Sequence, residues 1–288
     1  MIVKGKQSPL VSVVIPTYNQ ADFLRQAIQS VFDQSYSSWE IIIVDNESTD
    51  HTESVIRSFR SGKIKRLKIQ NHGIIAASRN TGIRHARGKF IAFLDSDDYW
   101  FPEKLRSSID QMTREKADAV CHSEYWLFEN GQQKAVSYGP ADRCTFRDLL
   151  KKGNCLSTSA ILVKKEQVLE VGGFSENAAF KTVEDYDLWI RLVKHGCRFT
   201  FNNTLLGVYR IHSSGNSQSI AKHANATLAL LHHYLSDGDT YFTERERRMI
   251  FFKVYRSTAF RFLKQMQLPK LAYWALCGAW FFLTGKSL

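Results

Sequence analysis

Apolar runs alternate with segments of helical periodicity through the first third of the chain. Four near-continuous apolar runs predict strands, at 10–16, 40–45, 66–69 and 89–95. The segments after the first three carry apolar residues at helical spacing, at 21–34, 49–59 and 75–86. Strands that are apolar at successive positions are buried on both faces. We therefore expect an α/β fold with an open, mostly parallel sheet and helices on both faces.

The elements become shorter beyond residue 119. We predict strands near 119–127 and at 158–164, 198–201 and 205–211, and helices near 145–151 and at 183–194. From residue 221 onward the pattern is helical. This change predicts an α/β domain over 1–215, followed by a helical C-terminal region over 216–288.

Composition and charge narrow the class of protein. With 288 residues and 44% hydrophobic content, the chain can bury a large core, and its formal net charge of +11 favours polyanionic partners: nucleic acid, nucleotide diphosphates or an anionic membrane surface. Five widely spaced cysteines without a C-x-x-C pair indicate reduced thiols. Because no twenty-residue uncharged run and no leader with a cleavage site are present, we expect a cytosolic protein.

The first candidate site is FIAFLDSDDYW, where the fourth apolar run ends in three aspartates. Asp95 and Asp97 lie two apart in an extended segment, so their carboxylates can point into one pocket and bind Mg²⁺ or Mn²⁺. The alternative is that Asp97 or Asp98 caps the helix that Pro102 begins, and Asp98 fits that role better. Spacing alone favours neither interpretation.

The second candidate is VEDYDLWIRL. Asp185 lies on the same helical stripe as Leu188 and Leu192, so it points inward and can act as a general base. A helix-terminal structural role is the alternative, and the residues alone favour it. Asp187 has Arg191 four residues on, which predicts an ion pair on the exposed face.

Two further side chains have open roles. His212 follows a predicted strand and can bind a metal or a phosphate, although an isolated histidine is more often an ordinary surface residue. Arg79, in GIIAASRNTG, can contact a phosphate or lie on a helix surface. Neither G-x-G-x-x-G after the first strand nor G-x-x-x-x-G-K-[ST] is present. Phosphate charge must therefore be neutralised by a metal and side chains.

An ordered set of motifs identifies the family. VSVVIPTYNQADFLRQAIQSVFDQSY, IIIVDNESTD, ASRNTGIRHARGKFIAFLDSDDYW, GGF and VEDYDLWIRL together resemble the inverting family 2 glycosyltransferases of bacterial surface-polysaccharide synthesis, over roughly residues 9–215. The resemblance implies the Rossmann-like GT-A fold and a nucleotide-diphosphate sugar donor, most often a uridine one. It also implies a divalent metal, Mn²⁺ or Mg²⁺, and transfer to an acceptor hydroxyl with inversion.

The same resemblance implies a role for each matched residue. On the donor side it places Thr17 and Tyr18 on the nucleoside, Asp45 on the base, Arg79 on the nucleotide side, Asp95 towards the ribose, Asp97 on the metal and His212 on the metal or diphosphate. On the acceptor side it makes Asp185 the catalytic base and Glu184 a residue that orients the acceptor. The second-strand loop reads DNES where many members read D-D-G-S, so Asn46 and Glu47 stand in place of an acid and a glycine.

The C-terminal region is rich in basic and aromatic residues and ends in LAYWALCGAWFFL, which is too short to span a bilayer. It can lie at the inner face of the cell membrane, or pack on the domain or on a second subunit, so a homo-oligomer remains open. A membrane location implies an acceptor on a lipid diphosphate carrier, as in O-antigen, capsule or exopolysaccharide synthesis. The alternatives are a metal-dependent nucleotidyltransferase and a non-enzymatic polyanion-binding or membrane-surface protein; we expect no nucleic-acid partner.

Overall fold

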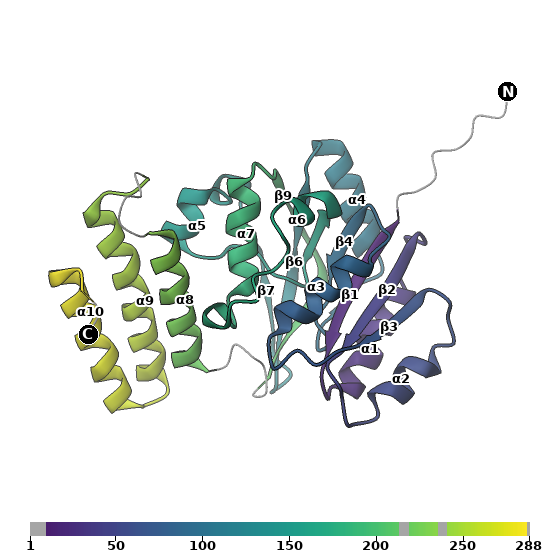
Figure 1. Ribbon diagram of the computed structural model, residues 1–288, viewed down its shortest axis with the longest axis horizontal. Helices are drawn as coiled ribbons and strands as arrows, with labels where there is room; N and C mark the ends of the chain where they lie inside the picture. The colour runs from purple at the N-terminus through teal and green to yellow at the C-terminus, as the bar shows by residue number, and fades with distance from the viewer. Residues whose placement is uncertain (1–9, 213–218, 236–240, 287–288) are drawn as a thin grey trace.

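A mixed sheet forms the centre of the molecule in the computed structural model, which describes residues 10–212, 219–235 and 241–286 (Figure 1). The strands in these ranges are β1 (Val11–Thr17), β2 (Trp39–Asp45), β3 (Ile64–Lys68), β4 (Phe90–Phe93), β5 (Tyr99–Trp100), β6 (Ala119–Phe128), β7 (Gln133–Val136), β8 (Ile161–Lys164) and β9 (Phe199–Ile211). The α-helices are α1 (Ala21–Phe32), α2 (Thr52–Ser58), α3 (Ile75–His85), α4 (Lys104–Glu115), α5 (Phe146–Lys152), α6 (Lys165–Glu170), α7 (Glu184–Lys194), α8 (Ile220–Tyr234), α9 (Glu244–Lys264) and α10 (Leu268–Thr284). Two short 3₁₀ turns lie at Ala141–Arg143 and Ala178–Phe180.

The strand order is β3-β2-β1-β4-β8-β6-β9-β5, with β7 paired to β6. The four N-terminal strands β3, β2, β1 and β4 run parallel, as the apolar runs predict. Strand β8 is antiparallel to both β4 and β6, and β9 returns parallel to β6. The carboxyl ends of β1, β2 and β4 therefore share one edge of the sheet.

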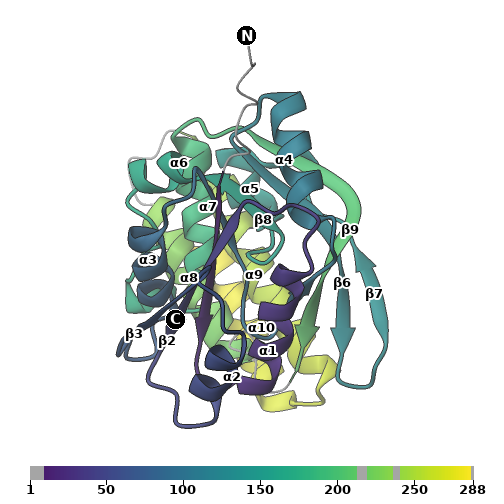
Figure 2. The ribbon, with the colours of Figure 1, turned by 90° about the vertical axis from the view of Figure 1, so that its right-hand side faces the viewer.

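Helices cover both faces of this sheet, which explains why the strands are apolar at successive positions (Figure 2). In β2, Ile41 and Ile43 pack in the core that contains Leu24 of α1. The alternate residue Ile42 packs in the second core with Ile83 of α3. The expected two-faced burial of the α/β sheet is thus confirmed.

Several boundaries differ from the sequence prediction. The segments 198–201 and 205–211 form the single strand β9, whose register against β6 shifts near Asn202 and Leu205. The strand expected at 158–164 begins only at Ile161, after a turn. Strands β5 and β7 and helix α6 were not predicted: β5 has two residues, β7 is mostly exposed, and α6 has six residues.

Helices α8, α9 and α10 stack beside α5 and α7 at one end of the molecule (Figure 1). Their buried residues, including Leu230, Phe251 and Phe281, belong to the same core cluster as Trp189 of α7. The C-terminal helices therefore pack on the α/β domain. The boundary proposed between residues 215 and 216 lies outside the described residues. No helix in the described ranges is both long and apolar enough to cross a membrane.

Candidate active site

A cleft of about 1490 Å³ opens at the carboxyl edge of the parallel strands. Residues after β1, β2, β3 and β4 line one part of it, and residues of α3, α5, α7, α8, α9, β6 and β9 line other parts. Cavities that hold one small ligand typically measure about 300–1,000 Å³. The cleft is thus large enough for two substrates side by side.

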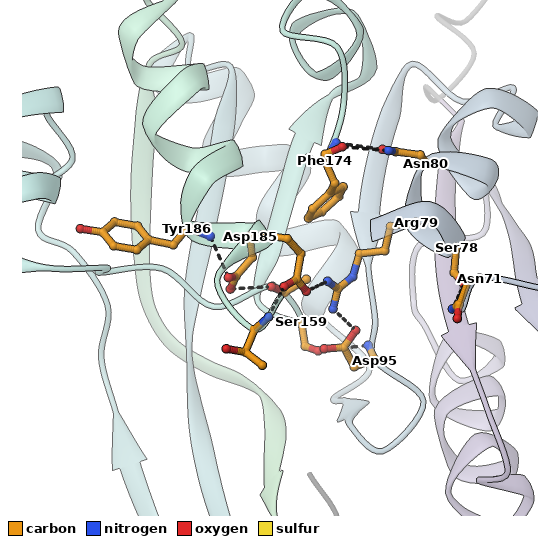
Figure 3. A network of polar contacts seen from close by, with 12 residues as sticks. Asn71, Ser78, Arg79, Asn80, Asp95, Ser159, Phe174, Asp185 and Tyr186 are labelled. Atoms are coloured by element: carbon orange, nitrogen blue, oxygen red, sulfur yellow. Dashed lines mark hydrogen bonds and ion pairs between the residues drawn. The ribbon is translucent and has the colours of Figure 1, made fainter. Parts of the chain in front are cut away.

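Arg79 joins the two acidic motifs that line this cleft (Figure 3). Its Nη2 donates to Oδ1 of Asp95 at 2.7 Å, and its Nη1 donates to Oε1 of Glu184 at 2.7 Å. The side chain of Arg79 is 4% exposed, so the surface-arginine interpretation is wrong. Burial of the bridge opposes ionisation of Arg79, but the carboxylates of Asp95 and Glu184 raise its pKa. The arginine remains charged and fixes the position of α3 relative to α7.

Both carboxylates of this bridge are already held by the protein. Glu184 also accepts a hydrogen bond from the backbone N–H of Thr182 at 2.9 Å, so each of its oxygens has a partner. Burial raises the pKa of Asp95, although the charge of Arg79 lowers it. Removing one partner of such a buried pair leaves an uncompensated charge, which typically costs about 3–5 kcal/mol. The bridge therefore connects the stability of the fold to the geometry of the cleft.

Asp185 is oriented from two sides at the start of α7. Its Oδ2 accepts from Oγ1 of Thr158 at 3.1 Å, and its Oδ1 accepts from the backbone N–H of Tyr186 at 2.7 Å. The side chain lines the cleft. Burial, followed by the negative charge of Glu184, raises the pKa of Asp185 to about 6. A carboxylate with this pKa is ionised at neutral pH and is more basic than an ordinary aspartate.

Asp97 and His212 meet across 115 residues of sequence. Nε2 of His212 lies 2.8 Å from Oδ2 of Asp97, and the imidazole is 10% exposed. A carboxylate oxygen and an imidazole nitrogen side by side suit Mn²⁺, which accepts both donor types, with phosphate oxygens and water as further ligands. No group of three or more His, Cys, Asp and Glu side chains able to hold a metal occurs in the described parts of the chain. A metal here would therefore depend on the substrate for part of its coordination.

Asp98 does not cap a helix, so the capping interpretation is wrong. Its Oδ2 accepts from Oγ of Ser159 at 2.5 Å and its Oδ1 from the backbone N–H of Arg210 at 2.9 Å. Helix α4 begins only at Lys104, after Glu103, and no side-chain cap is present. Because Asp98 fastens the end of β9 to the loop after β4, it brings His212 to Asp97.

Asp187 pairs with Arg191 at 2.7 Å as predicted, but the pair does not lie on an exposed face. The carboxylate is 2% exposed and also accepts from the hydroxyl of Tyr234 at 2.7 Å. The position is buried because α8 covers this side of α7, which the spacing within α7 does not reveal.

The expected nucleoside-binding residues follow β1 and β2. Thr17 and Tyr18 line the cleft, and Oγ1 of Thr17 is buried without a hydrogen-bond partner in the described structure. Asp45 is 1% exposed, accepts from the backbone N–H of Ser48 at 2.9 Å and lies 3.4 Å from Nη2 of Arg66. Its neighbours Asn46 and Glu47 line the cleft instead. Contact of Asp45 with a base remains a prediction.

Comparison with known proteins decides the family. Residues 12–165, more than half of the chain, match the model described as "Glycosyl transferase family 2". The chain belongs to glycosyltransferase family 2. It is 31% identical over 211 residues to the Escherichia coli "UDP-Glc:alpha-D-GlcNAc-diphosphoundecaprenol beta-1,3-glucosyltransferase WfgD", covering 73% of this chain and 80% of that one. It is 30% identical over 222 residues to the Bacillus subtilis "Putative teichuronic acid biosynthesis glycosyltransferase TuaG", covering 76% of this chain and 86% of that one.

Solved glycosyltransferase structures share the GT-A fold of this chain. S. aureus TarS 1-349 in complex with UDP-GlcNAc superposes with a TM-score of 0.67 at 18% identity, covering 92% of this chain and 79% of that one. The mannosyltransferase PcManGT from Pyrobaculum calidifontis, in complex with GDP-Man and Mn²⁺, superposes with a TM-score of 0.63 at 17% identity. The superposition covers 98% of this chain and 89% of that one. The expected GT-A fold is confirmed, and membership of the family favours glycosyl transfer over nucleotidyl transfer or simple polyanion binding.

Sequence reasoning missed one acidic residue of this glycosyltransferase. Glu124 in β6 is 1% exposed and accepts from the hydroxyl of Tyr138 at 2.5 Å. Burial raises the pKa of Glu124 to about 7. The hydroxyl of Tyr138 also accepts from Nε1 of Trp126 at 3.1 Å, and both rings line the cleft. The sequence did offer a signal for Glu124, since it is the single acidic residue of AVCHSEYW, within the segment predicted as a strand.

Proposed function

We propose that this glycosyltransferase moves a sugar from a uridine-diphosphate donor to a hydroxyl of a lipid-diphosphate-linked acceptor, with inversion at the anomeric carbon. One observation carries the proposal: Asp185, with its raised pKa, lines the same cleft as Asp97, whose carboxylate His212 contacts. A base and a diphosphate site on one cleft are the two elements that a single displacement requires.

The steps follow from the side chains. Asp185 accepts the proton of the acceptor hydroxyl as its oxygen attacks the anomeric carbon, and Thr158 and the Tyr186 N–H hold the carboxylate in place. A single attack from the face opposite the leaving diphosphate inverts the configuration. Asp97 and His212 would hold a divalent metal, which would neutralise the charge that grows on the leaving diphosphate.

The names of relatives support the substrate classes. WfgD is named for UDP-Glc as donor and for a diphosphoundecaprenol-linked acceptor, as is the E. coli enzyme WfaP, at 30% identity over 72% of this chain. TarS was solved with UDP-GlcNAc, and PcManGT with Mn²⁺. We extend a uridine donor, a metal and a lipid-diphosphate acceptor to this chain.

Calorimetric titration of UDP tests the donor half of the proposal. Wild-type protein is titrated with and without Mn²⁺, alongside Asp97→Ala. We expect Mn²⁺ to strengthen binding at least about tenfold in the wild type and to have no effect in the variant, because Asp97 supplies the carboxylate ligand. Asp110→Ala, which removes an exposed aspartate of α4 outside the cleft, is the control and should bind like the wild type. Equal UDP affinity with and without Mn²⁺ in the wild type would remove the metal assignment.

A further inference from the structure

The cleft has two halves of opposite charge. The carboxylates that line it, Glu47, Asp95, Asp97, Glu184 and Asp185, lie near the strand ends and the start of α7. Beyond Asp185, where α5, α8 and α9 form the walls, the lining residues the structure describes include five cations and no carboxylate. These five, here called the basic half, are Lys151, Lys152, Lys253, Arg256 and Arg261. The nucleotide side alone does not account for them.

His223 of α8 lines the same cleft as the basic half and contacts the segment that leads into α7. His223 of α8 lies with Nδ1 3.2 Å from Oγ1 of Thr182, whose N–H donates to Glu184 at 2.9 Å. Burial, followed by the positive charge of Arg261, lowers the pKa of His223, so Arg261 lies within electrostatic range of this histidine. Helix α9 packs on α8, where the rings of Phe251 and His232 lie 4.4 Å apart, so α8 connects α9 to Thr182 and to the residue beside Asp185.

Three of the five cations already contact other residues of the protein. Nζ of Lys151 lies 3.2 Å from Oε1 of Glu246, and Nζ of Lys152 lies 3.0 Å from Oδ2 of Asp148. Nζ of Lys253 donates to the backbone oxygen of Lys151 at 3.1 Å. The other two, Arg256 and Arg261, form no ion pair with any residue in 10–212, 219–235 or 241–286. Both arginines line the cleft from α9, and neither has an ion-pair partner in the part of the chain that the structure describes. Such guanidinium groups suit an anion with several oxygens, since arginine donates in a fixed fork.

We propose that Arg256 and Arg261 of α9 bind the diphosphate of the acceptor. The inference rests on the proposed function, because that function makes the acceptor approach the sugar from the side of Asp185. The donor diphosphate then lies on the opposite side of the transferred sugar, near Asp97 and His212. The basic half is therefore left for a second diphosphate, which joins the acceptor sugar to its lipid. The ligand class is a lipid diphosphate.

Direct binding of geranyl diphosphate, a soluble lipid diphosphate, tests the subsite. Calorimetry is run in EDTA without donor on the wild type, on Arg256→Gln/Arg261→Gln and on Arg245→Gln. Arg245 is an exposed arginine on the first turn of α9 outside the cleft, so it controls for general loss of charge. We expect the double variant to bind at least about tenfold more weakly and Arg245→Gln to match the wild type. Equal weakening in both variants, or in neither, overturns the proposal.

A second arm separates the two diphosphates and the two proposals. UDP is titrated with Mn²⁺ into the same proteins, and its affinity should not change in the double variant. A parallel loss of UDP and geranyl diphosphate affinity would assign Arg256 and Arg261 to the donor and overturn the subsite. The wild type could also bind geranyl diphosphate but no UDP, while the double variant binds geranyl diphosphate more weakly. In that case the proposed UDP donor is wrong and the lipid-diphosphate subsite stands.

Discussion

The raised pKa of Asp185 makes this residue a stronger base but lowers the stability of the folded protein. Its pKa rises from an ordinary 3.8 to about 6, a difference of about 3 kcal/mol between its two protonation states. A carboxyl whose pKa is higher in the folded protein disfavours folding once it is ionised. The ionised form therefore destabilises the fold above pH 6 and has no such effect below about pH 4.

We predict that Asp185→Asn abolishes transfer while making the protein more stable above pH 6. In the wild type, kcat/KM should fall about tenfold per pH unit below pH 6, because the base becomes protonated. Initial rates across pH 5–8 and urea unfolding at pH 5 and 8 measure both effects.

Asp187→Asn is the matched control on the same helix. Asp187 pairs with Arg191 and Tyr234, so its loss should lower stability and leave the pH profile of the remaining activity unchanged. Transfer at the wild-type rate by Asp185→Asn would exclude Asp185 as the base.

At the scale of elements, the GGF segment fastens the loop before α7 to α3. Asn80 accepts from the N–H of Phe174 and donates to its carbonyl, both at 2.8 Å (Figure 3). The ring of Phe174 lies 5.2 Å from the guanidinium of Arg79. A Cβ on Gly173, where φ is +74°, would lie 2.5 Å from Oδ1 of Asn80. The glycine is thus required by a close approach as well as by φ.

We predict that Gly173→Ala costs about 2–4 kcal/mol of unfolding free energy and raises the KM for the donor, because displacing Asn80 and Phe174 disturbs the Arg79 bridge. Urea unfolding and donor kinetics measure this. Gly172→Ala is the control: φ is +80° there, but no atom lies within 4 Å of the added Cβ, so only backbone strain of about 1 kcal/mol is expected. Equal losses in the two variants would show that the contact with Asn80 is unimportant.

The parallel half of the fold could be predicted because β1, β2 and β4 are buried on both faces. Each strand is therefore apolar at successive positions, and this local pattern is enough to predict it. Strand β7 is mostly exposed, and β5 has two residues, so neither carries a pattern. Most of the residues predicted for the site line the cleft, but the sequence did not predict the contacts between them. Arg79 donates to Glu184, which lies 105 residues later in the sequence, and Asp98 accepts from the backbone of β9, 112 residues later. Residue spacing along the sequence cannot predict contacts over such separations.

The whole molecule presents an uncovered apolar stripe at the end formed by α10. Tyr273, Leu276, Trp280 and Leu283 recur every three or four residues and are 45–74% exposed. Lys264 and Lys270 lie at the adjoining ends of α9 and α10. An apolar face beside cations on a chain of net charge +11 complements an anionic bilayer, where a lipid-linked acceptor would be found.

We predict that the protein binds vesicles containing about one third anionic lipid and releases them at high salt, because each basic residue near such a surface contributes about 1 kcal/mol. Leu276→Ser/Trp280→Ser should weaken binding at least about tenfold, since two apolar side chains no longer enter the interface. Co-sedimentation measures this. Leu169→Ser, at a leucine 49% exposed on α6, removes a comparable side chain elsewhere and should leave binding unchanged. If the wild type instead dimerises in solution and the double variant is monomeric without any change in vesicle binding, the stripe is an interface between two copies and the membrane assignment is wrong.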